Sequence, residues 1–194
     1  MNRPLLSVFC RSVTSAMKEI ESRSKTIDIV FNNAGIAFHK DAVDVDTAAF
    51  QNVINTNLIG VYTVARAAAD VMIRNKTKGS IINVASISGY IVNIPQFQCA
   101  YNVSKAGVIH MTRSLAVEWV EFGIRVNSLS PGYVGTPMSV DVREDWKTAW
   151  NSMTPMKRMA YPEEMVPPVL YLASPAAGYT TGSDVVVDGG YICT

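Results

Sequence analysis

Short β-branched apolar runs alternate along this chain with longer segments of helical character. The runs that predict buried strands cover residues 27–31, 80–84, 124–129 and 184–187. The segments that predict helices cover residues 11–24, 47–75, 101–122 and 162–174. Continuous apolar strands suit a parallel sheet covered on both faces, and their alternation with helices is typical of right-handed crossovers. The sequence therefore predicts an α/β fold with a doubly wound parallel sheet.

The composition is that of one globular domain. Hydrophobic residues fill 48% of the 194 positions and the formal net charge is +1, so we expect a single domain over residues 1–194. No basic excess is available to neutralise phosphates, which argues against nucleic acid as a partner. The sequence contains no uncharged apolar run of about 18 residues, so no membrane span is expected.

The cysteines and histidines are few. Cys10, Cys99 and Cys193 lie far apart, which is typical of reduced thiols in a cytoplasmic protein rather than of a disulfide framework. The only histidines are His39 and His110, too few for a His-rich metal cluster. We therefore expect a cytoplasmic protein without a metal site.

One segment interrupts the alternation of strands and helices. From Gly132 to about Ala160 no strand pattern appears, and the residues up to Trp150 predict a loop that carries short helices. In a doubly wound sheet, ligands bind beyond the carboxyl ends of the strands. Residues 132–160 leave the third strand at that edge, so they are a candidate substrate loop or lid. The alternative is a surface excursion without function.

Tyr101 and Lys105 stand at the start of the predicted helix over residues 101–122. Their spacing places both side chains on one helix face. The pKa of a tyrosine in water is about 10, and a nearby cation favours the phenolate and lowers that pKa. Such a pair is suited to exchanging a proton with an alcohol or a carbonyl. Alone it is weak evidence, because the spacing also arises by chance on ordinary helices.

Small or hydroxylated residues follow three of the predicted strands. The first strand ends in Asn32-Asn33-Ala34-Gly35, the second runs into Ser86 and Ser88, and residues 130–136 follow the third. The carboxyl ends of parallel strands meet at one edge of a sheet, and the helix with Tyr101 begins beside it. The sequence therefore predicts a binding crevice at this edge.

Together these features resemble the short-chain dehydrogenase/reductase family over nearly the whole chain. The matching motifs are Asn32-Asn33-Ala34-Gly35, Asn57 in Asn-Leu-x-Gly, Ser86, Tyr101-x-x-x-Lys105, Pro131-Gly132 with Thr136, and the final Val-Asp-Gly-Gly. Each motif is modest alone, and their order and distances make the resemblance specific. It implies a Rossmann-like sheet and an oxidoreductase that uses NAD or NADP.

The resemblance also implies roles for individual residues. Tyr101 would be the acid–base group, Ser86 would hydrogen-bond the reacting oxygen, and Lys105 would lower the Tyr101 pKa and hold the nicotinamide ribose. Asn57 would position a water beside Lys105, although a buried asparagine that braces the helix is the plainer alternative. The other implied cofactor contacts are Asn33, Ala34 and Gly35 on the adenosine side, and Pro131, Gly132, Val134 and Thr136 around nicotinamide. For residues 33–35 the alternative is a tight turn.

A narrower resemblance is to the fungal polyol branch of the family, with dehydrogenases or reductases of the arabinitol, mannitol and sorbose type. It rests on residues 88–96, 101–110, 156–159 and 179–182. The segment between Ser86 and Tyr101 is longer than in the wider family and carries amide side chains. Ser88, Asn93 and Gln96 are therefore candidate contacts for a polyol or ketose, and Gln98 belongs to the same loop. The alternative is that these loop amides face solvent.

The glycine-rich turn with which the family begins, and which contacts the cofactor pyrophosphate, is absent from the sequence. The position that selects NAD or NADP is absent with it, so both cofactors stay open. We expect the chain to lack the first three strands of the family fold, which makes the strand at 27–31 an exposed edge. As this polypeptide it should bind dinucleotide weakly and be a weak or inactive enzyme.

Other interpretations stay open beside an oxidoreductase of sugar alcohols and ketoses. A family member that acts on an acyl or steroid carbonyl is the nearer one. A non-catalytic oligomerising fragment is the other, because the helices at 47–75 and 101–122 resemble those that pair subunits in the family. In each case a homo-oligomer, dimer or tetramer, is expected. A start codon assigned too far downstream would also account for the missing segment.

Overall fold

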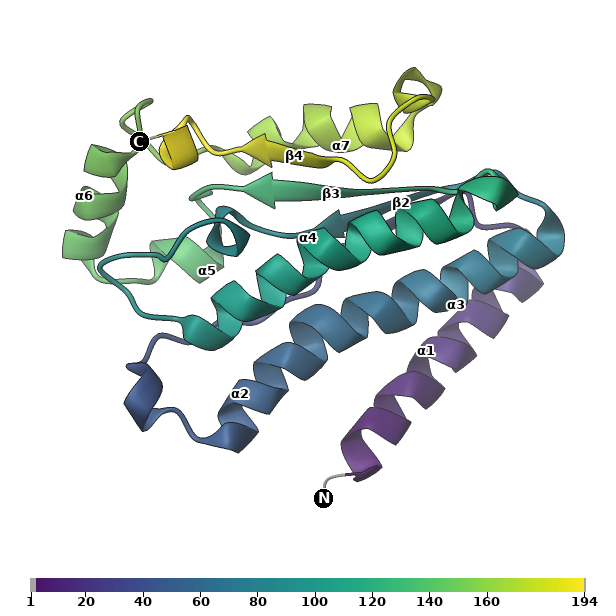
Figure 1. The fold of residues 1–194 in the computed structure, drawn as a ribbon, viewed down its shortest axis with the longest axis horizontal. Helices are drawn as coiled ribbons and strands as arrows, with labels where there is room; N and C mark the ends of the chain where they lie inside the picture. Colours follow the sequence, from purple (N-terminus) through teal and green to yellow (C-terminus); the bar gives the residue numbers. More distant parts are fainter. Residues whose placement is uncertain (1–2, 194) are drawn as a thin grey trace.

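The computed structural model describes residues 3–193 and places helices on both faces of a parallel sheet (Figure 1). Residues 1–2 and 194, the two ends of the predicted domain, lie outside the described residues. The strands are β1 (Ile29–Asn32), β2 (Ser80–Val84), β3 (Arg125–Pro131) and β4 (Asp184–Val187), and they lie side by side in chain order. Each neighbouring pair is parallel. The predicted α/β fold and its four strands are confirmed.

The helices divide between the two faces of the sheet. On one face lie α3 (Gly60–Asn75) and α4 (Cys99–Trp119), which contact β1, β2 and β3, and α1 (Arg3–Ser24) packs mainly against α3 (Figure 1). On the other face α7 (Val166–Ala173) contacts β2 and β3. This cover on both faces explains why the strands are continuously apolar rather than alternating.

Two neighbouring residues of β2 show how the core is divided. Ile81 is buried in a cluster with residues of α3 and α4, including Met72 and Leu115. Ile82 points to the opposite face and packs in a cluster with Leu129 and with Leu172 of α7. Successive side chains of a strand alternate between its faces, so one strand anchors both helical layers.

The predicted helix over residues 47–75 is not one regular α-helix. It consists of α2 (Thr47–Ile54), a π-helical segment (Asn55–Ile59) and α3. The sequence prediction of a continuous helix is right in extent and wrong in its middle. π-Helical turns are rare and often occur at functional sites, and this one carries Asn57.

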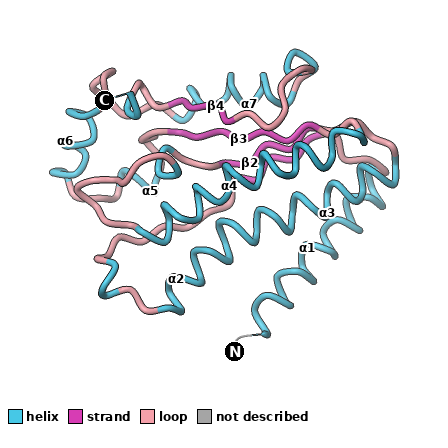
Figure 2. Tube along the Cα trace, in the orientation of Figure 1, coloured by secondary structure: helices cyan, strands magenta, loops and turns pink. Residues whose placement is uncertain are grey.

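The segment after β3 carries short helices and no strand, as the sequence predicts. α5 (Pro137–Val140) and α6 (Glu144–Met153) lie beyond the carboxyl end of β3 (Figure 2). An isolated bridge between Val134 and Ala160 closes the base of the segment. The next helix begins with a 3-10 turn at Pro162–Met165 before α7 continues it.

Strand β1 forms an edge of the sheet. It pairs with β2 alone in the sheet order, and two of its apolar side chains, Ile29 and Phe31, are 52% and 44% exposed. The sequence prediction of an exposed edge is confirmed. The edge lies beside the loop that leads into the predicted crevice, so its exposure also bears on the site.

Candidate active site

A cavity of about 720 Å³ lies at the carboxyl ends of β1, β2 and β3. This is the edge at which the sequence predicts a crevice, and the volume falls in the range of small-molecule sites. The predicted site residues that line it are Asn33, Ala34, Gly35, Ser86, Ser88, Asn93, Gln96, Tyr101, Lys105, Pro131, Gly132, Val134 and Thr136. Asn57 is fully buried in the π-helical segment behind this lining.

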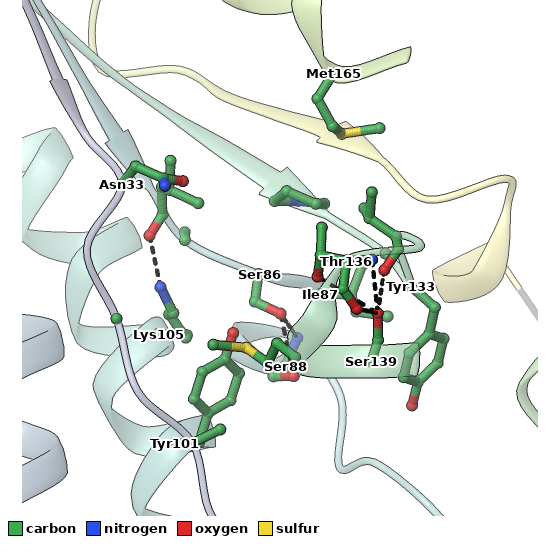
Figure 3. Close-up of a pocket in the computed structure, with 18 of the residues that line it drawn as sticks. Asn33, Ser86, Ile87, Ser88, Tyr101, Lys105, Tyr133, Thr136, Ser139 and Met165 are labelled. Atoms are coloured by element: carbon green, nitrogen blue, oxygen red, sulfur yellow. Dashed lines mark hydrogen bonds between the residues drawn. The ribbon is translucent and has the colours of Figure 1, made fainter. Parts of the chain in front are cut away.

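Tyr101 lies in the first turn of α4 and directs its hydroxyl toward Ser86 (Figure 3). Burial raises the pKa of the Tyr101 phenol above its ordinary value, and a hydrogen bond with the Ser86 side chain opposes that rise. The phenol therefore stays protonated at neutral pH. The ammonium group of Lys105 binds the Val84 carbonyl rather than the phenol, so a lowering of the Tyr101 pKa by Lys105 stays a prediction.

Lys105 lies one helical turn after Tyr101 and is 3% exposed. Its Nζ donates a hydrogen bond of 2.7 Å to the carbonyl oxygen of Val84 at the end of β2. The same nitrogen is 5.4 Å from the centroid of the Tyr101 ring. Burial lowers the pKa of Lys105 to about 8. The spacing of four residues therefore does bring the two side chains together on one helix face.

Ser86 and Ser88 lie where β2 runs into a 3-10 turn (Ile87–Gly89), and Ser86 is the N-cap of that turn. Ser86 Oγ accepts the Ser88 backbone N–H at 3.1 Å, and the two hydroxyl oxygens are also 3.1 Å apart. Both side chains are buried. The strand end therefore presents two adjacent, oriented hydroxyl groups to the phenol of Tyr101.

Asn57 holds the loop that follows β1. Its Oδ1 accepts the Ile36 backbone N–H and its Nδ2 donates to the Ile36 carbonyl, each at 2.8 Å. The amide also donates to Ser104 Oγ at 3.2 Å. A Cβ added at Gly35 would lie 3.4 Å from Asn57 Oδ1 and 3.6 Å from Lys105 Nζ. These hydrogen bonds are those expected of a buried, bracing asparagine, the alternative that the sequence analysis left open. The position beside Lys105 Nζ is also the one that the water-positioning role requires.

The amides of the β2–α4 loop are buried, so the alternative of solvent-facing side chains is wrong. Asn93 and Gln96 are each 2% exposed. Their amide nitrogens donate to the Tyr133 hydroxyl at 3.1 and 2.9 Å, and Trp150 Nε1 donates to Gln96 Oε1 at 2.9 Å. Tyr133 and Trp150 stack with ring centroids 4.1 Å apart. The loop before α4 is therefore tied to the segment over residues 132–160.

Several lining residues are not predicted from the sequence. They are His39 and Gln98 on the side of the β1 and β2 loops, Trp150 of α6, and Met165, Val166, Val169 and Leu170 from the segment that contains α7. Met165 lies on the side of the close-up away from Tyr101 (Figure 3). Two of them had a sequence signal: Gln98 through its place in the lengthened loop before Tyr101, and Trp150 through its place in the candidate lid over residues 132–160.

Among the described side chains, those of residues 12–139 and 141–193, no group of three or more His, Cys, Asp or Glu is arranged to hold a metal ion. No helix of this described part is long and apolar enough to cross a membrane. Cys99 and Cys193 are free and exposed thiols; nothing is described for the side chain of Cys10.

A family model described as enoyl-(acyl carrier protein) reductase matches residues 10–192. Among curated proteins, the D-arabinitol 2-dehydrogenase (ribulose-forming) of Candida tropicalis is 49% identical over 177 residues, 89% of this chain and 63% of its own length. The NADP-dependent mannitol dehydrogenase of Aureobasidium melanogenum is 43% identical over 93% of this chain and 67% of its own length. The chain thus spans less than two thirds of the first of these relatives.

A solved structure of a short-chain type dehydrogenase/reductase from Mycobacterium marinum superposes on the fold with a TM-score of 0.92. It is 42% identical in sequence, and the match covers 95% of this chain and 72% of that one. The family model's match over residues 10–192 includes all four strands and the segment with Tyr101 and Lys105. The chain therefore belongs to the short-chain dehydrogenase/reductase family, and its relatives include fungal polyol dehydrogenases.

Proposed function

We propose that this chain carries the catalytic part of an NAD(P)-dependent oxidoreductase that interconverts a sugar alcohol and a ketose. The observation that carries the proposal is the convergence of Tyr101, Ser86 and Lys105 on one cavity. The names of the relatives, which are dehydrogenases of arabinitol and mannitol, support the substrate class.

The residues around the cavity fit the nicotinamide end of such a cofactor. Gly35 leaves the space beside Lys105 Nζ that a side chain would begin to fill. Lys105 presents a buried cation suited to ribose hydroxyls, and Pro131, Val134 and Thr136 line the wall after β3. We assign the adenosine side to Asn33, Ala34 and Gly35 and the nicotinamide side to residues 131–136.

The side chains supply proton transfer and orientation, while the nicotinamide ring when bound supplies or accepts the hydride. In the direction of ketose reduction, Tyr101 donates its phenolic proton to the carbonyl oxygen, and its raised pKa keeps that proton in place at neutral pH. Ser86 donates a hydrogen bond to the same oxygen. Lys105, with a pKa of about 8, replenishes the phenol proton and stabilises the phenolate. A positioned acid of this kind contributes roughly 10²–10⁴-fold.

A few polar side chains in the largely apolar lining of the cavity favour a substrate with several hydroxyl groups. Ser88, Asn93 and Gln96 all line it and are buried. Their side chains are hydrogen-bonded to Gln98, Tyr133 and Trp150, and we propose that substrate hydroxyl groups join this network, which apolar acyl or steroid substrates would not do. We assign Ser88, Asn93 and Gln96 to substrate binding and residues 132–160 to a lid over it.

The phosphate end of the cofactor has no glycine-rich turn in this sequence. We therefore propose that the polypeptide of 194 residues binds NAD or NADP weakly and turns over slowly. One of the relatives is named an NADP-dependent mannitol dehydrogenase, which supports NADP as the first cofactor to test. The choice is an outcome of that test, because the residues that make it are absent.

Homo-oligomer formation is part of the proposal. Apolar side chains of α3 and α4 are exposed on the outer helical layer, among them Tyr62 at 43%, Val103 at 48% and Val117 at 77%. Such a surface suits a second copy of the chain, and we propose a dimer or tetramer in the cytoplasm. A stable oligomer without any turnover would favour the non-catalytic alternative.

The test is a substrate panel at millimolar cofactor. We expect ketoses such as ribulose and fructose to consume reduced nicotinamide, while a short enoyl thioester and a steroid ketone do not. The Tyr101→Phe variant gives the background rate, which is the consumption of reduced nicotinamide that does not depend on the Tyr101 phenol. Turnover of the thioester alone, or equal rates in the variant and the wild-type chain, would overturn the proposal.

A further inference from the structure

Gln98, the N-cap residue of α4, is a hub of hydrogen bonds at the cavity wall. Its side chain is 7% exposed. Its Nε2 lies 2.9 Å from Asn93 Oδ1 and 3.2 Å from both Ser88 Oγ and Asn102 Oδ1. An amide nitrogen has two protons for these three acceptors, so the contacts compete for the same donor.

The amide of Gln98 has a fixed direction. On its other side lies His39 of the loop after β1: burial lowers the pKa of the imidazole, and a side-chain hydrogen bond with Gln98 opposes that shift. His39 is itself packed edge-on against Trp146, with ring centroids 5.1 Å apart. Reversal of the amide would turn Oε1 toward the oxygens of Asn93 and Asn102, which is repulsive. Nε2 therefore points to Ser88.

The hydrogen bonds continue from Ser88 to the reacting groups. Ser88 Oγ receives the Gln98 donor at 3.2 Å and lies 3.1 Å from Ser86 Oγ. The Tyr101 hydroxyl points toward Ser86 (Figure 3), and a side-chain hydrogen bond with Ser86 opposes the rise of the Tyr101 pKa. A hydroxyl group has one proton to donate. The Ser88 oxygen and the substrate oxygen that Tyr101 protonates therefore compete for the proton of Ser86. When Ser88 Oγ accepts a hydrogen bond from Gln98, one of its lone pairs is occupied, and it becomes a weaker acceptor for the Ser86 proton.

We propose that Gln98 is a positioning residue that, held by His39 and acting through Ser88, directs the Ser86 hydroxyl toward the oxygen that Tyr101 protonates. This role rests on the proposed function. It extends the site from the three reacting side chains to the loop after β1. Gln98 does not need to touch the substrate for this role, so its effect falls on kcat rather than on the KM for the cofactor.

The first arm of the test is spectroscopic and needs no turnover. The side-chain amide signals of Gln98 in a ¹⁵N–¹H spectrum, assigned with Gln98→Met, should shift in Ser88→Ala and again in His39→Ala. The signals of the exposed Gln51 should stay in place in both variants. Gln98 signals that do not move in either variant would overturn the hydrogen-bond chain.

The second arm is a kinetic cycle with Gln98→Met, Ser88→Ala and the double variant. Gln98→Met should lower kcat for ketose reduction by roughly tenfold to a hundredfold with an unchanged KM for NADPH, as expected for a misdirected reacting group. In the Ser88→Ala background the same substitution should add little, because its effect passes through Ser88. Gln51→Met is the matched control on an exposed helix face.

The outcomes separate the two proposals. Turnover by the wild-type chain together with an unchanged kcat in Gln98→Met, or with fully additive effects in the double variant, overturns the positioning role and leaves the proposed function standing. A wild-type chain that reduces no ketose overturns the proposed function, and the catalytic role of Gln98 with it, even where the spectra confirm the hydrogen bonds.

Discussion

The ammonium nitrogen of Lys105 lies 5.4 Å from the centroid of the Tyr101 ring and gives its hydrogen bond to the Val84 carbonyl at 2.7 Å. The two side chains share a helix face without a direct bond between them. Each is shifted by burial toward its neutral form, the phenol upward in pKa and the amine downward to about 8. Because the two pKa values are shifted in these directions, the pair can pass a proton to or from a substrate oxygen at a small cost in free energy.

Replacement of Tyr101 by Phe should remove the proton donor and little else. We expect kcat/KM for ketose reduction to fall by roughly 10²–10⁴-fold, with the thermal unfolding midpoint almost unchanged, because the ring remains. Steady-state kinetics and circular dichroism measure the two effects. Tyr62→Phe, on the exposed face of α3, is the matched control and should behave as the wild-type chain. An active Tyr101→Phe variant contradicts the assignment.

The burial of Lys105 predicts how stability changes with pH. Its folded pKa is about 8 against 10.5 for the free side chain, so between these values the unfolded chain binds more protons. The free energy of unfolding should therefore rise with pH in that window, by about 2 kcal/mol from pH 8 to pH 10. Below pH 8 the lysine is charged in both states and the penalty of burial is constant.

Urea unfolding at a series of pH values measures this slope. Lys105→Met has no titrating group at the position, so its curve should be flatter across the same window. Above about pH 10 the tyrosines oppose the trend, because Tyr90 has a raised pKa of about 12 and its ionisation in the unfolded chain lowers stability. Equal slopes in the wild-type chain and in Lys105→Met would be evidence against a buried cation.

Loss of the Asn57 amide should destabilise the fold. Asn57→Ala leaves the Ile36 N–H and carbonyl without their partner, and Ser104 loses a donor. We expect a cost of about 3 kcal/mol, in the range for buried polar groups left unpaired. Chemical denaturation gives the value. The exposed Asn52 of α2 provides the control Asn52→Ala, for which the change should be small; equal losses would contradict the role of the buried bonds.

Cofactor binding should depend mainly on the nicotinamide half, with a small contribution from Asn33, Ala34 and Gly35 on the adenosine side. Reduced nicotinamide mononucleotide lacks the adenosine half, and the sequence lacks the glycine-rich turn that binds phosphate. Its dissociation constant should therefore be within about tenfold of that for NADPH, a difference of about 1.4 kcal/mol. Fluorescence titration compares the two ligands. Binding of NADPH more tightly by about a thousandfold would show a phosphate site that the proposal does not include.

The edge strand β1 should promote association of the chain. An exposed apolar edge offers unpaired backbone groups to another strand, and Ile29 is 52% exposed there. Ile29→Lys should lower the apparent mass at high protein concentration in sedimentation experiments. Val43→Lys, at a position that is 90% exposed outside the sheet, should not. An identical mass distribution for both variants and the wild-type chain would exclude this edge.

The strands were predictable because their signal is local. The strand at 80–84 has the predicted bounds, since a buried central strand is apolar along its whole length. The predicted strand at 27–31 begins two residues later, at Ile29, where its pairing with Ser80 begins. The third strand continues to Pro131 because β4 pairs with it that far. Strand ends depend on the neighbour, which the sequence does not display.

The cavity was predictable in part for the same reason. Tyr101, Lys105 and Ser86 follow from local spacing and strand ends. The wall contributed by Trp150, His39 and α7 depends on segments that meet only in the folded chain. The direction of the loop amides was equally hidden, because it is set by Tyr133 and Trp150, far away in sequence.

The π-helical segment Asn55–Ile59 makes the number of residues between α2 and α3 critical. An α-helix turns by about 100° per residue, so deletion of a single residue here would rotate α2 against α3 by that angle. Asn57 would leave the loop after β1, and the apolar faces of the two helices would no longer align. Surface loops of this fold tolerate insertions, whereas in this helix a gain or loss of one residue would disturb the core and the cavity together.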